Sequence, residues 1–160
     1  MIIVDCGSSG SLDSPDQMSI FAWYFPMDLS SSRRARIGKR HGGEFLTVEG
    51  SSVGYESANN VGNWNNNFYV SNIVNLNSWQ FFGFTFKSND YVKIYKNGSM
   101  VGSNSVYGEQ STNSYPCVVG TEIEGGWGTP PYFSGLIDDV RIYNRALSAS
   151  EISALYNATK

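Results

Sequence analysis

The stretch SGLIDDVRIYNRALSASEISALYN (residues 134–157) joins a strand pattern to a helix signal. Its first half has the branched and aromatic residues of a buried strand, but Asp138 and Asp139 stand side by side within it. A carboxylate removed from water needs a charge partner or a metal, because unpaired burial is strongly unfavourable. The doublet is therefore a catalytic pair, a set of metal ligands, a salt-bridged pair or the solvent-facing end of a strand.

The second half of this stretch predicts a helix over about residues 148–157. Ser148 and Glu151 have the spacing of a capping box, in which each side chain accepts a hydrogen bond from the backbone N–H of the other residue. Three apolar residues follow on one helical face: Ile152, Leu155 and Tyr156. Because so short a helix does not persist alone in water, we expect this face to pack on the body of the protein.

Upstream, the chain has the pattern of successive strands. The segment MSIFAWYFP (residues 18–26) is apolar at both alternating sets of positions, which is typical of a strand covered on both sides. The segment NSWQFFGFTFK (residues 77–87) carries closely spaced aromatic residues over one strand length. We expect Trp23 and Trp79, which lie in these two patterns, to belong to the core.

A hairpin is the clearest local signal. In YVKIYKNGSMVGS (residues 91–103), Asn97 and Gly98 separate two alternating runs, and both residues tolerate the positive φ of a type I′ turn. Many short antiparallel strands followed by one terminal helix predict an all-β protein. We expect a two-sheet antiparallel β-sandwich of the jelly-roll kind, forming a single domain over residues 1–160.

The composition limits the classes of partner that the protein is expected to bind. The net charge is -3 and the sequence pI is about 5.0, which gives no general argument for binding nucleic acid. No apolar run approaches the roughly 20 residues that span a bilayer, so no membrane span is expected. The opening segment has no basic leader, so no signal peptide is visible. The two cysteines, Cys6 and Cys117, could form a disulfide or remain two buried thiols.

Three segments together resemble one protein family. Residues 134–157 are similar to the closing signature of the laminin-G-like domains in the concanavalin A-like lectin/glucanase superfamily. Residues 77–103 resemble the middle segment of these domains, and DQMSIFAWYFP (residues 16–26) resembles an early strand. The resemblance covers most of residues 12–157 and implies a concanavalin A-like jelly roll. That fold occurs in lectins, carbohydrate-binding modules, glycosidases and adhesion domains, so it does not specify one function.

The beginning of the chain departs from the family pattern. Domains of this family usually carry an opening segment that runs beside the closing strand, here about residues 136–143. Without it that strand has an unpaired edge, which can pair with another chain. The segment MIIVDC (residues 1–6) is expected to fold back and pair there. Two alternatives remain: charged side chains could tolerate an open edge, or a second subunit could add a strand by self-association.

The acidic residues argue against catalysis. Glycosidases of this fold need two carboxylates in one cleft, but adjacent strand residues such as Asp138 and Asp139 point to opposite faces unless a bulge intervenes. Glu122 and Glu124 share a face but lie in a segment that continues with two glycines. With His41 as the single histidine, a Ser/His/Asp set is not indicated either. We therefore expect a protein that is not an enzyme.

The family resemblance implies a different role for the acidic doublet. In related glucanases and lectins, the first acid of the closing strand helps to hold a structural calcium ion, which implies Asp138 as a Ca²⁺ ligand. The alternative is a salt bridge from Asp138 or Asp139 to Arg141 or Arg145. Two further acids could replace the calcium ligands of the opening segment: Asp5 and Asp13.

Aromatic residues in polar segments suggest a sugar-binding site. Sugars stack on aromatic faces and hydrogen-bond to amide groups, and binding residues concentrate on loops over a rigid scaffold. The segments NNVGNWNNNFYV (residues 59–70) and EGGWGTPPYFSG (residues 124–135) have this composition. In the alternative interpretation these aromatics cover the edge of the core. The predicted ligand-binding residues are Asn63, Trp64, Asn65, Trp127 and Tyr132.

A basic segment, RRARIGKRHGG (residues 33–43), stands out in this acidic protein. It could meet a sulfated or uronic polysaccharide, and the alternative is a solvated charged face. Taken together, the sequence predicts a non-catalytic, lectin-like carbohydrate-binding module that is extracellular or on a particle surface. The alternatives are a structural or adhesion subunit of a surface or viral assembly and, second, a glycoside hydrolase.

Overall fold

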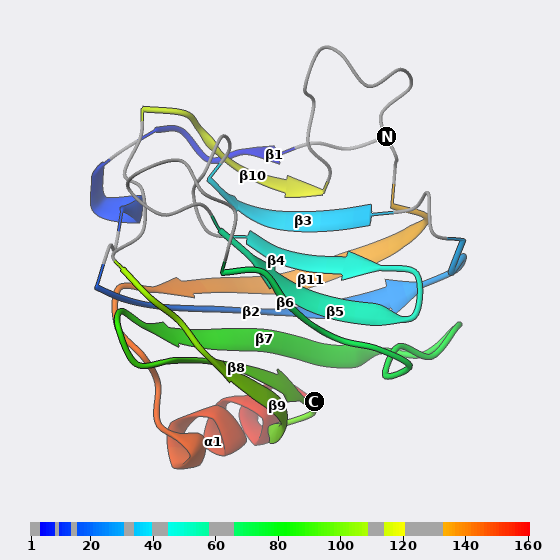
Figure 1. The fold of residues 1–160 in the computed structure, drawn as a ribbon. Helices are drawn as coiled ribbons and strands as arrows, with labels where there is room; N and C mark the ends of the chain where they lie inside the picture. Colours follow the sequence, from blue (N-terminus) through cyan, green and yellow to red (C-terminus); the bar gives the residue numbers. More distant parts are fainter. Residues whose placement is uncertain are drawn as a thin grey trace.

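Two antiparallel sheets face each other in the computed structural model, which describes residues 4–8, 10–13, 16–30, 34–39, 45–57, 66–108, 114–120 and 133–160 (Figure 1). The six-stranded sheet has the order β1 (Val4–Asp5), β10 (Cys117–Gly120), β3 (Arg34–Lys39), β4 (Phe45–Glu49), β5 (Ser52–Glu56), β6 (Phe68–Val70). The five-stranded sheet has the order β11 (Gly135–Tyr143), β2 (Gln17–Pro26), β7 (Gln80–Lys87), β8 (Tyr91–Lys96), β9 (Ser99–Ser105). A 3-10 helix, η1 (Gly10–Leu12), precedes β2, and the helix α1 (Ala149–Thr159) follows β11. The predicted all-β sandwich with a C-terminal helix is confirmed.

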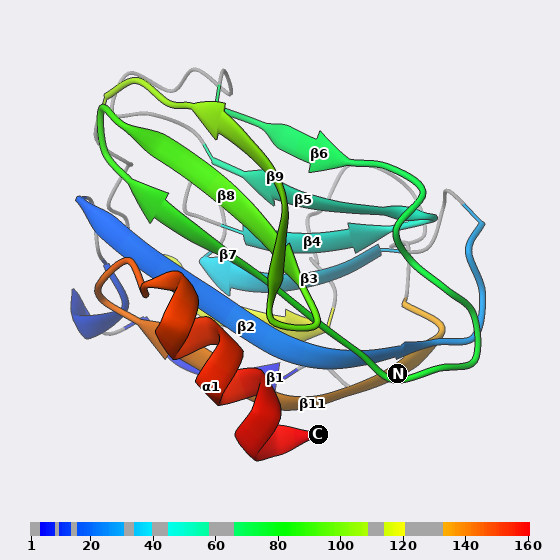
Figure 2. The same cartoon turned by 90° about the horizontal axis from the view of Figure 1, so that it is seen from below.

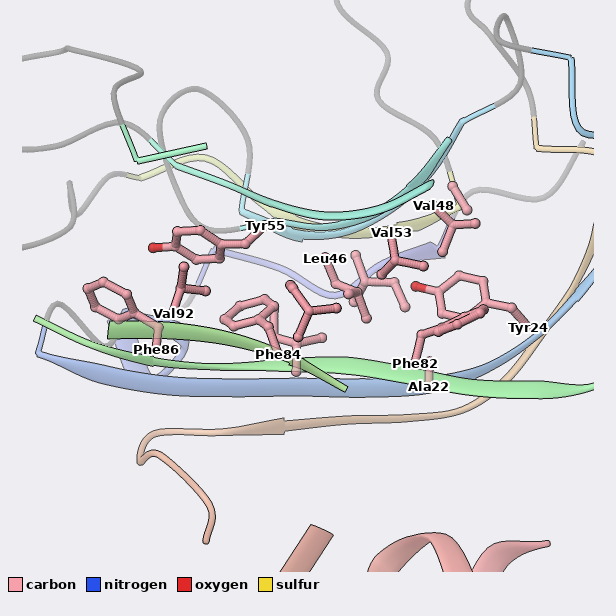
Figure 3. Close-up of a cluster of buried hydrophobic side chains, with 14 of the residues drawn as sticks. Ala22, Tyr24, Leu46, Val48, Val53, Tyr55, Phe82, Phe84, Phe86 and Val92 are labelled. Atoms are coloured by element: carbon pink, nitrogen blue, oxygen red, sulfur yellow. The ribbon is translucent and has the colours of Figure 1, made fainter. Parts of the chain in front are cut away.

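The core lies between the two sheets and follows the period-two alternation of the strands. Figure 3 shows Phe82, Phe84 and Phe86 of β7 pointing toward the six-stranded sheet. There Tyr55 of β5 stacks on Phe86 with ring centroids 5.6 Å apart and meets Phe84 edge-on at 4.8 Å. All four rings are fully buried. These aromatic contacts join the two sheets.

A second apolar cluster explains why residues 18–26 are apolar on both faces. The helix α1 lies against the outer face of the five-stranded sheet (Figure 2). The buried residues of this cluster are Phe21, Phe81, Tyr95, Leu147 and Ile152. The inner face of β2 packs into the core while its outer face packs under the helix, so the expectation of a strand covered on both sides is confirmed.

The helix begins as the sequence predicts. Ser148 is the N-cap, its side chain accepts from the backbone of Glu151, and Glu151 accepts from the Ser148 backbone at 2.8 Å. At the other end the indole N–H of Trp23 donates to the Thr159 hydroxyl at 3.0 Å. The predicted turn is also present, with φ of 50° at Asn97 and 80° at Gly98. No helix in the described part of the chain is long and apolar enough to cross a membrane.

The acidic doublet lies at a β-bulge in β11. Asp138 pairs with Trp23 of β2 and Arg141 pairs with Phe21, so two residues of β11 stand opposite one of β2. Asp139 has φ 48°, in the left-handed region that Asp tolerates better than most residues. The extra residue changes which side chains face the core. It lets Ile137, Val140 and Ile142 all pack on the core between the sheets.

The predicted position of the N-terminal segment is wrong. Val4 and Asp5 pair with Val119 and Val118 of β10, at an edge of the six-stranded sheet, rather than with β11. The edge of β10 offers regular N–H and C=O groups, whereas the bulge interrupts their spacing on β11.

Among the described strands, β11 pairs only with β2. The edge of β11 that faces away from β2 has two features that discourage pairing with another strand, a bulge and charged side chains. In addition, the backbone N–H of Asp139 donates to the side chain of Asp138 at 2.8 Å. These features agree with the alternative in which charged side chains allow this edge to remain without a further strand. Self-association through this edge stays a prediction.

The expectation that Trp79 belongs to the core is wrong. This residue precedes β7, it is 43% exposed, and its ring packs on Phe25 with centroids 5.6 Å apart. The helix contacts Phe81, two residues further along, through Tyr156 at a centroid distance of 6.2 Å. Trp23 is partly buried under the helix, as predicted. The sequence pattern identified the strand, but it could not show how far the helix covers its outer face.

Candidate ligand-binding face

A cluster of polar and aromatic side chains lies on the outer face of the six-stranded sheet. The strands of this sheet bow toward the core in Figure 3, so their outer face is concave. Core residues of β3, such as Ala35 and Ile37, alternate with Arg36, which therefore points outward. The pairing registers place one row of residues across this face: Arg36, Thr47, Gly54 and Tyr69.

A buried ion pair is the centre of this cluster. The Nη2 atom of Arg36 lies 2.6 Å from Oε2 of Glu56, and the two side chains are 13% and 7% exposed. The guanidinium carbon of Arg36 lies 5.3 Å from the centre of the Phe45 ring, a cation–π distance. Because both charges are largely removed from water, each depends on the other for its stability.

Tyr69 completes the cluster from β6. Its hydroxyl donates to Oε1 of Glu56. The ring lies over Gly54, where an added Cβ would approach ring atoms to 2.4 Å, so glycine is required for this placement. Burial, followed by the charge of Glu56 and the hydrogen bond to it, raises the pKa of Tyr69. The hydroxyl therefore stays protonated at neutral pH and acts as a donor. We call Arg36, Phe45, Glu56 and Tyr69 the concave-face cluster.

The solvated-face interpretation of the basic segment is wrong for two of its residues. Arg36 belongs to the concave-face cluster, and Lys39 is 2% exposed with its Nζ atom 2.7 Å from Oδ1 of Asp13. Both lie on β3, inside the six-stranded sheet. The alternation of Ala35 and Ile37 with arginines is the sequence signal that could have identified this strand. Arg33, Arg40 and His41 lie outside the described residues.

The asparagine-rich segment is anchored at both ends. The backbone N–H of Ser57 donates to Oδ1 of Asn67 at 3.1 Å. The amide of Asn66 exchanges two hydrogen bonds with the backbone of Tyr107, at 3.0 and 3.3 Å. Asn66 and Asn67 therefore have a structural role. The predicted ligand residues Asn63, Trp64 and Asn65 lie outside the described residues, so their role stays a prediction.

The strand that precedes the second predicted segment ends beside the concave-face cluster. Gly120, the last residue of β10, pairs with Arg36 of β3. The predicted residues Trp127 and Tyr132 follow in the part of the chain that is not described, and so do Glu122 and Glu124. Ser57 and Gly120, the last described residues before the two aromatic segments, thus lie next to the same cluster, whereas residues 133–135 at the end of the second segment lead into β11 of the five-stranded sheet.

The two residues of the acidic doublet have different partners. Oδ1 and Oδ2 of Asp139 accept hydrogen bonds from Nε and Nη2 of Arg141 at 3.0 and 3.1 Å, which confirms the salt-bridge alternative for this pair. Arg145 pairs with Glu151 instead. The bulge that two catalytic carboxylates would need on this strand is present, but Asp139 is engaged by Arg141.

The other acids proposed as calcium ligands have partners of their own. Asp5 accepts the backbone N–H of Gly7 at 2.8 Å, and Asp13 pairs with Lys39. In the described part of the chain, no three His, Cys, Asp or Glu side chains converge on one point. At the bulge the Asp139 carboxylate is bound by Arg141, so ligands that join Asp138 in holding calcium would be carbonyls, water or groups outside that part. Calcium binding by Asp138 stays a prediction.

If Asp138 holds calcium, a chelator should lower the melting temperature of the protein and added calcium should restore it, because a ligand that binds only the folded state stabilises it. Asp138→Ala should abolish this response, and Asp139→Ala should retain most of it. Differential scanning fluorimetry with and without chelator measures the effect. An unchanged melting curve of the unsubstituted protein would rule out a stabilising calcium ion.

The sequence itself matches a known family. Residues 4–153 match the family described as the concanavalin A-like lectin/glucanases superfamily, in its laminin G group. The chain belongs to this superfamily. The predicted family is thus confirmed, and its two-sheet architecture agrees with the sandwich described above. A search of the curated proteins finds no match.

Solved structures share the fold at low sequence identity. One is a Ruminococcus gnavus IT-sialidase CBM40 bound to α2,3-sialyllactose, with TM-score 0.72 and 17% identity, covering 92% of this chain and 86% of that one. Another is the binding domain of botulinum neurotoxin serotype G, with TM-score 0.68 and 17% identity, covering 98% of this chain. The chain spans only 40% of the length of that toxin domain. At these identities the likeness shows the lectin-like fold alone.

Proposed function

We propose that this protein is a non-catalytic carbohydrate-binding module whose ligand binds at the concave face of the six-stranded sheet. The observation that carries the proposal is the concave-face cluster, a rigid group of charged and aromatic side chains. The described chain ends beside it at Ser57 and at Gly120, shortly before each aromatic segment that is predicted to bind sugar. A rigid sheet that presents variable segments is a common arrangement for binding sites.

The chemistry of the cluster suits sugar recognition. The ion pair between Arg36 and Glu56 fixes hydrogen-bonding groups that need no rearrangement, and such preorganisation favours binding. Tyr69 contributes a half-buried aromatic ring on the same face, and the fully buried Phe45 ring supports the Arg36 guanidinium. The CBM40 structure with sialyllactose supports the choice of ligand class, because the chain matches nearly the whole of that module. A module of this kind would act outside the cell or on a particle surface.

A glycan array with neutral, sialylated, sulfated and uronic sugars tests the proposal and identifies the ligand class. For the best glycan, Trp64→Ala or Trp127→Ala should weaken binding by about 1–3 kcal/mol, the usual effect of removing a well-packed aromatic contact. Isothermal titration calorimetry measures the loss.

Trp79→Ala is the matched control, because its exposed indole lies by the five-stranded sheet, away from the concave face. It should leave glycan binding unchanged. The proposal fails if no glycan binds, or if all three variants bind as the unsubstituted protein does.

A further inference from the structure

The two cysteines lie opposite each other on neighbouring strands. Val4 and Asp5 of β1 pair with Val119 and Val118 of β10. The ladder continues beyond these residues, because Cys6 N–H donates to the Cys117 carbonyl at 2.9 Å and Cys117 N–H donates to the Gly7 carbonyl at 2.9 Å. Because Cys117 N–H bonds to Gly7 rather than to Cys6, Cys6 and Gly7 together stand opposite Cys117, and the two cysteines are neighbours across the strands.

This placement suits a disulfide. Directly opposed residues in antiparallel strands have Cα atoms about 4.5–5.5 Å apart, within the range of about 4.4–6.8 Å found for disulfides. The Cys6 side chain is also close enough to raise the pKa of Cys117, and both cysteines are free in the structure. Closing the bond therefore requires little movement of the backbone.

We propose that Cys6 and Cys117 form a reversible disulfide that fastens β1 to the six-stranded sheet. The oxidant is a small-molecule disulfide such as oxidised glutathione. The Cys6 sulfur attacks one sulfur of this molecule and releases one thiol. The Cys117 sulfur then attacks the Cys6 sulfur, forms the protein disulfide and releases the second thiol. The two cysteines together lose two electrons and two protons, and the small disulfide is reduced to two thiols.

The two thiols have different environments, which sets the order of these steps. Cys6 is exposed, whereas Cys117 is buried. Burial, and secondarily the neighbouring Cys6, raises the pKa of Cys117 to about 12. Because the thiolate is the nucleophile in exchange reactions, the exposed Cys6 reacts with the oxidant first and Cys117 resolves the mixed disulfide.

The disulfide would act at a weakly held part of the fold. The strand β1 has two residues, pairs only with β10 among the described strands, and leaves Val4 48% exposed. Little apolar burial therefore holds it in place. A bond between residues 6 and 117 would also close a long loop in the unfolded chain, and longer loops give greater stabilisation in the chain-entropy description.

The test uses the folded, full chain in buffers with different ratios of reduced and oxidised glutathione. Intact mass measurement should show the loss of two hydrogen atoms under oxidising conditions, and peptide mapping should link Cys6 to Cys117. The melting temperature should rise by about 10 °C on oxidation and return on reduction. Cys6→Ser and Cys117→Ala should each show no such rise.

The controls separate the disulfide from other effects of oxidation. Cys6→Ser changes an exposed side chain and so should keep the melting temperature of the reduced protein. In Cys117→Ala, Cys6 should accumulate only the glutathione adduct. The proposal is overturned if the unsubstituted protein also stops at this adduct, if neither cysteine reacts while the protein is folded, or if the internal disulfide forms without raising the melting temperature.

Discussion

Glu56→Ala is expected to lower the free energy of unfolding by about 3–5 kcal/mol, because it removes the carboxylate that lies 2.6 Å from the largely buried guanidinium of Arg36. Arg36→Ala should have an effect of similar size, since Glu56 is only 7% exposed. The Glu56 change also removes the acceptor of the Tyr69 hydroxyl. Urea denaturation followed by tryptophan fluorescence measures both losses.

The protein contains its own control for this prediction. Asp139 and Arg141 form a two-point carboxylate–guanidinium pair, but their side chains are 32% and 39% exposed. Exposed pairs contribute about 0–1 kcal/mol, so Arg141→Ala, which breaks this pair without replacing the residue at positive φ, should lower stability far less than Glu56→Ala. Replacing Arg36 and Glu56 together by apolar residues should recover part of the loss. Equal effects at the buried and exposed pairs would contradict the role assigned to burial.

Local signals in the sequence predicted much of this fold. The capping box at Ser148, the turn at Asn97 and the apolar alternation of residues 18–26 depend on neighbouring residues, so they can be recognised without knowledge of the whole structure. The partner of β1 could not be found in this way. Whether Val4 pairs with β10 or β11 depends on which distant edge is regular, and the bulge that disturbs β11 forms only where two strands meet.

The candidate site was harder to predict for the same reason. Charge density drew attention to residues 33–43, but a solvated face was expected because the other members of the concave-face cluster lie on strands β4, β5 and β6. Neither Glu56 nor Tyr69 has a local pattern that marks it as a partner. A short alternation, Ala35 and Ile37 around Arg36, could have identified an amphipathic strand and hence an ordered arginine.

The bulge also explains why two acidic residues occur within a strand that is otherwise apolar. A regular strand would turn Ile137 and Val140 to opposite faces, because they are three residues apart. The inserted residue brings both to the core, and Asp139 can adopt the positive φ that the bulge uses. Asp138 accepts a hydrogen bond from the N–H of Asp139, and Arg141 donates to its carboxylate. The doublet thus supports the strand geometry whether or not Asp138 also binds calcium.

Phe84→Ala is expected to lower the free energy of unfolding by about 3–5 kcal/mol, the usual effect of removing a large aromatic side chain from a core. Phe84 is fully buried in the middle of β7, and its ring meets Tyr55 of the opposite sheet edge-on at 4.8 Å. The truncation therefore leaves a cavity where the two sheets are joined. Tyr107→Ala is the control, because that ring is 76% exposed and its loss should change stability by no more than about 0.5 kcal/mol. Urea denaturation should place the two variants several kcal/mol apart, and similar midpoints would show that the contact between Phe84 and Tyr55 does not hold the sheets together.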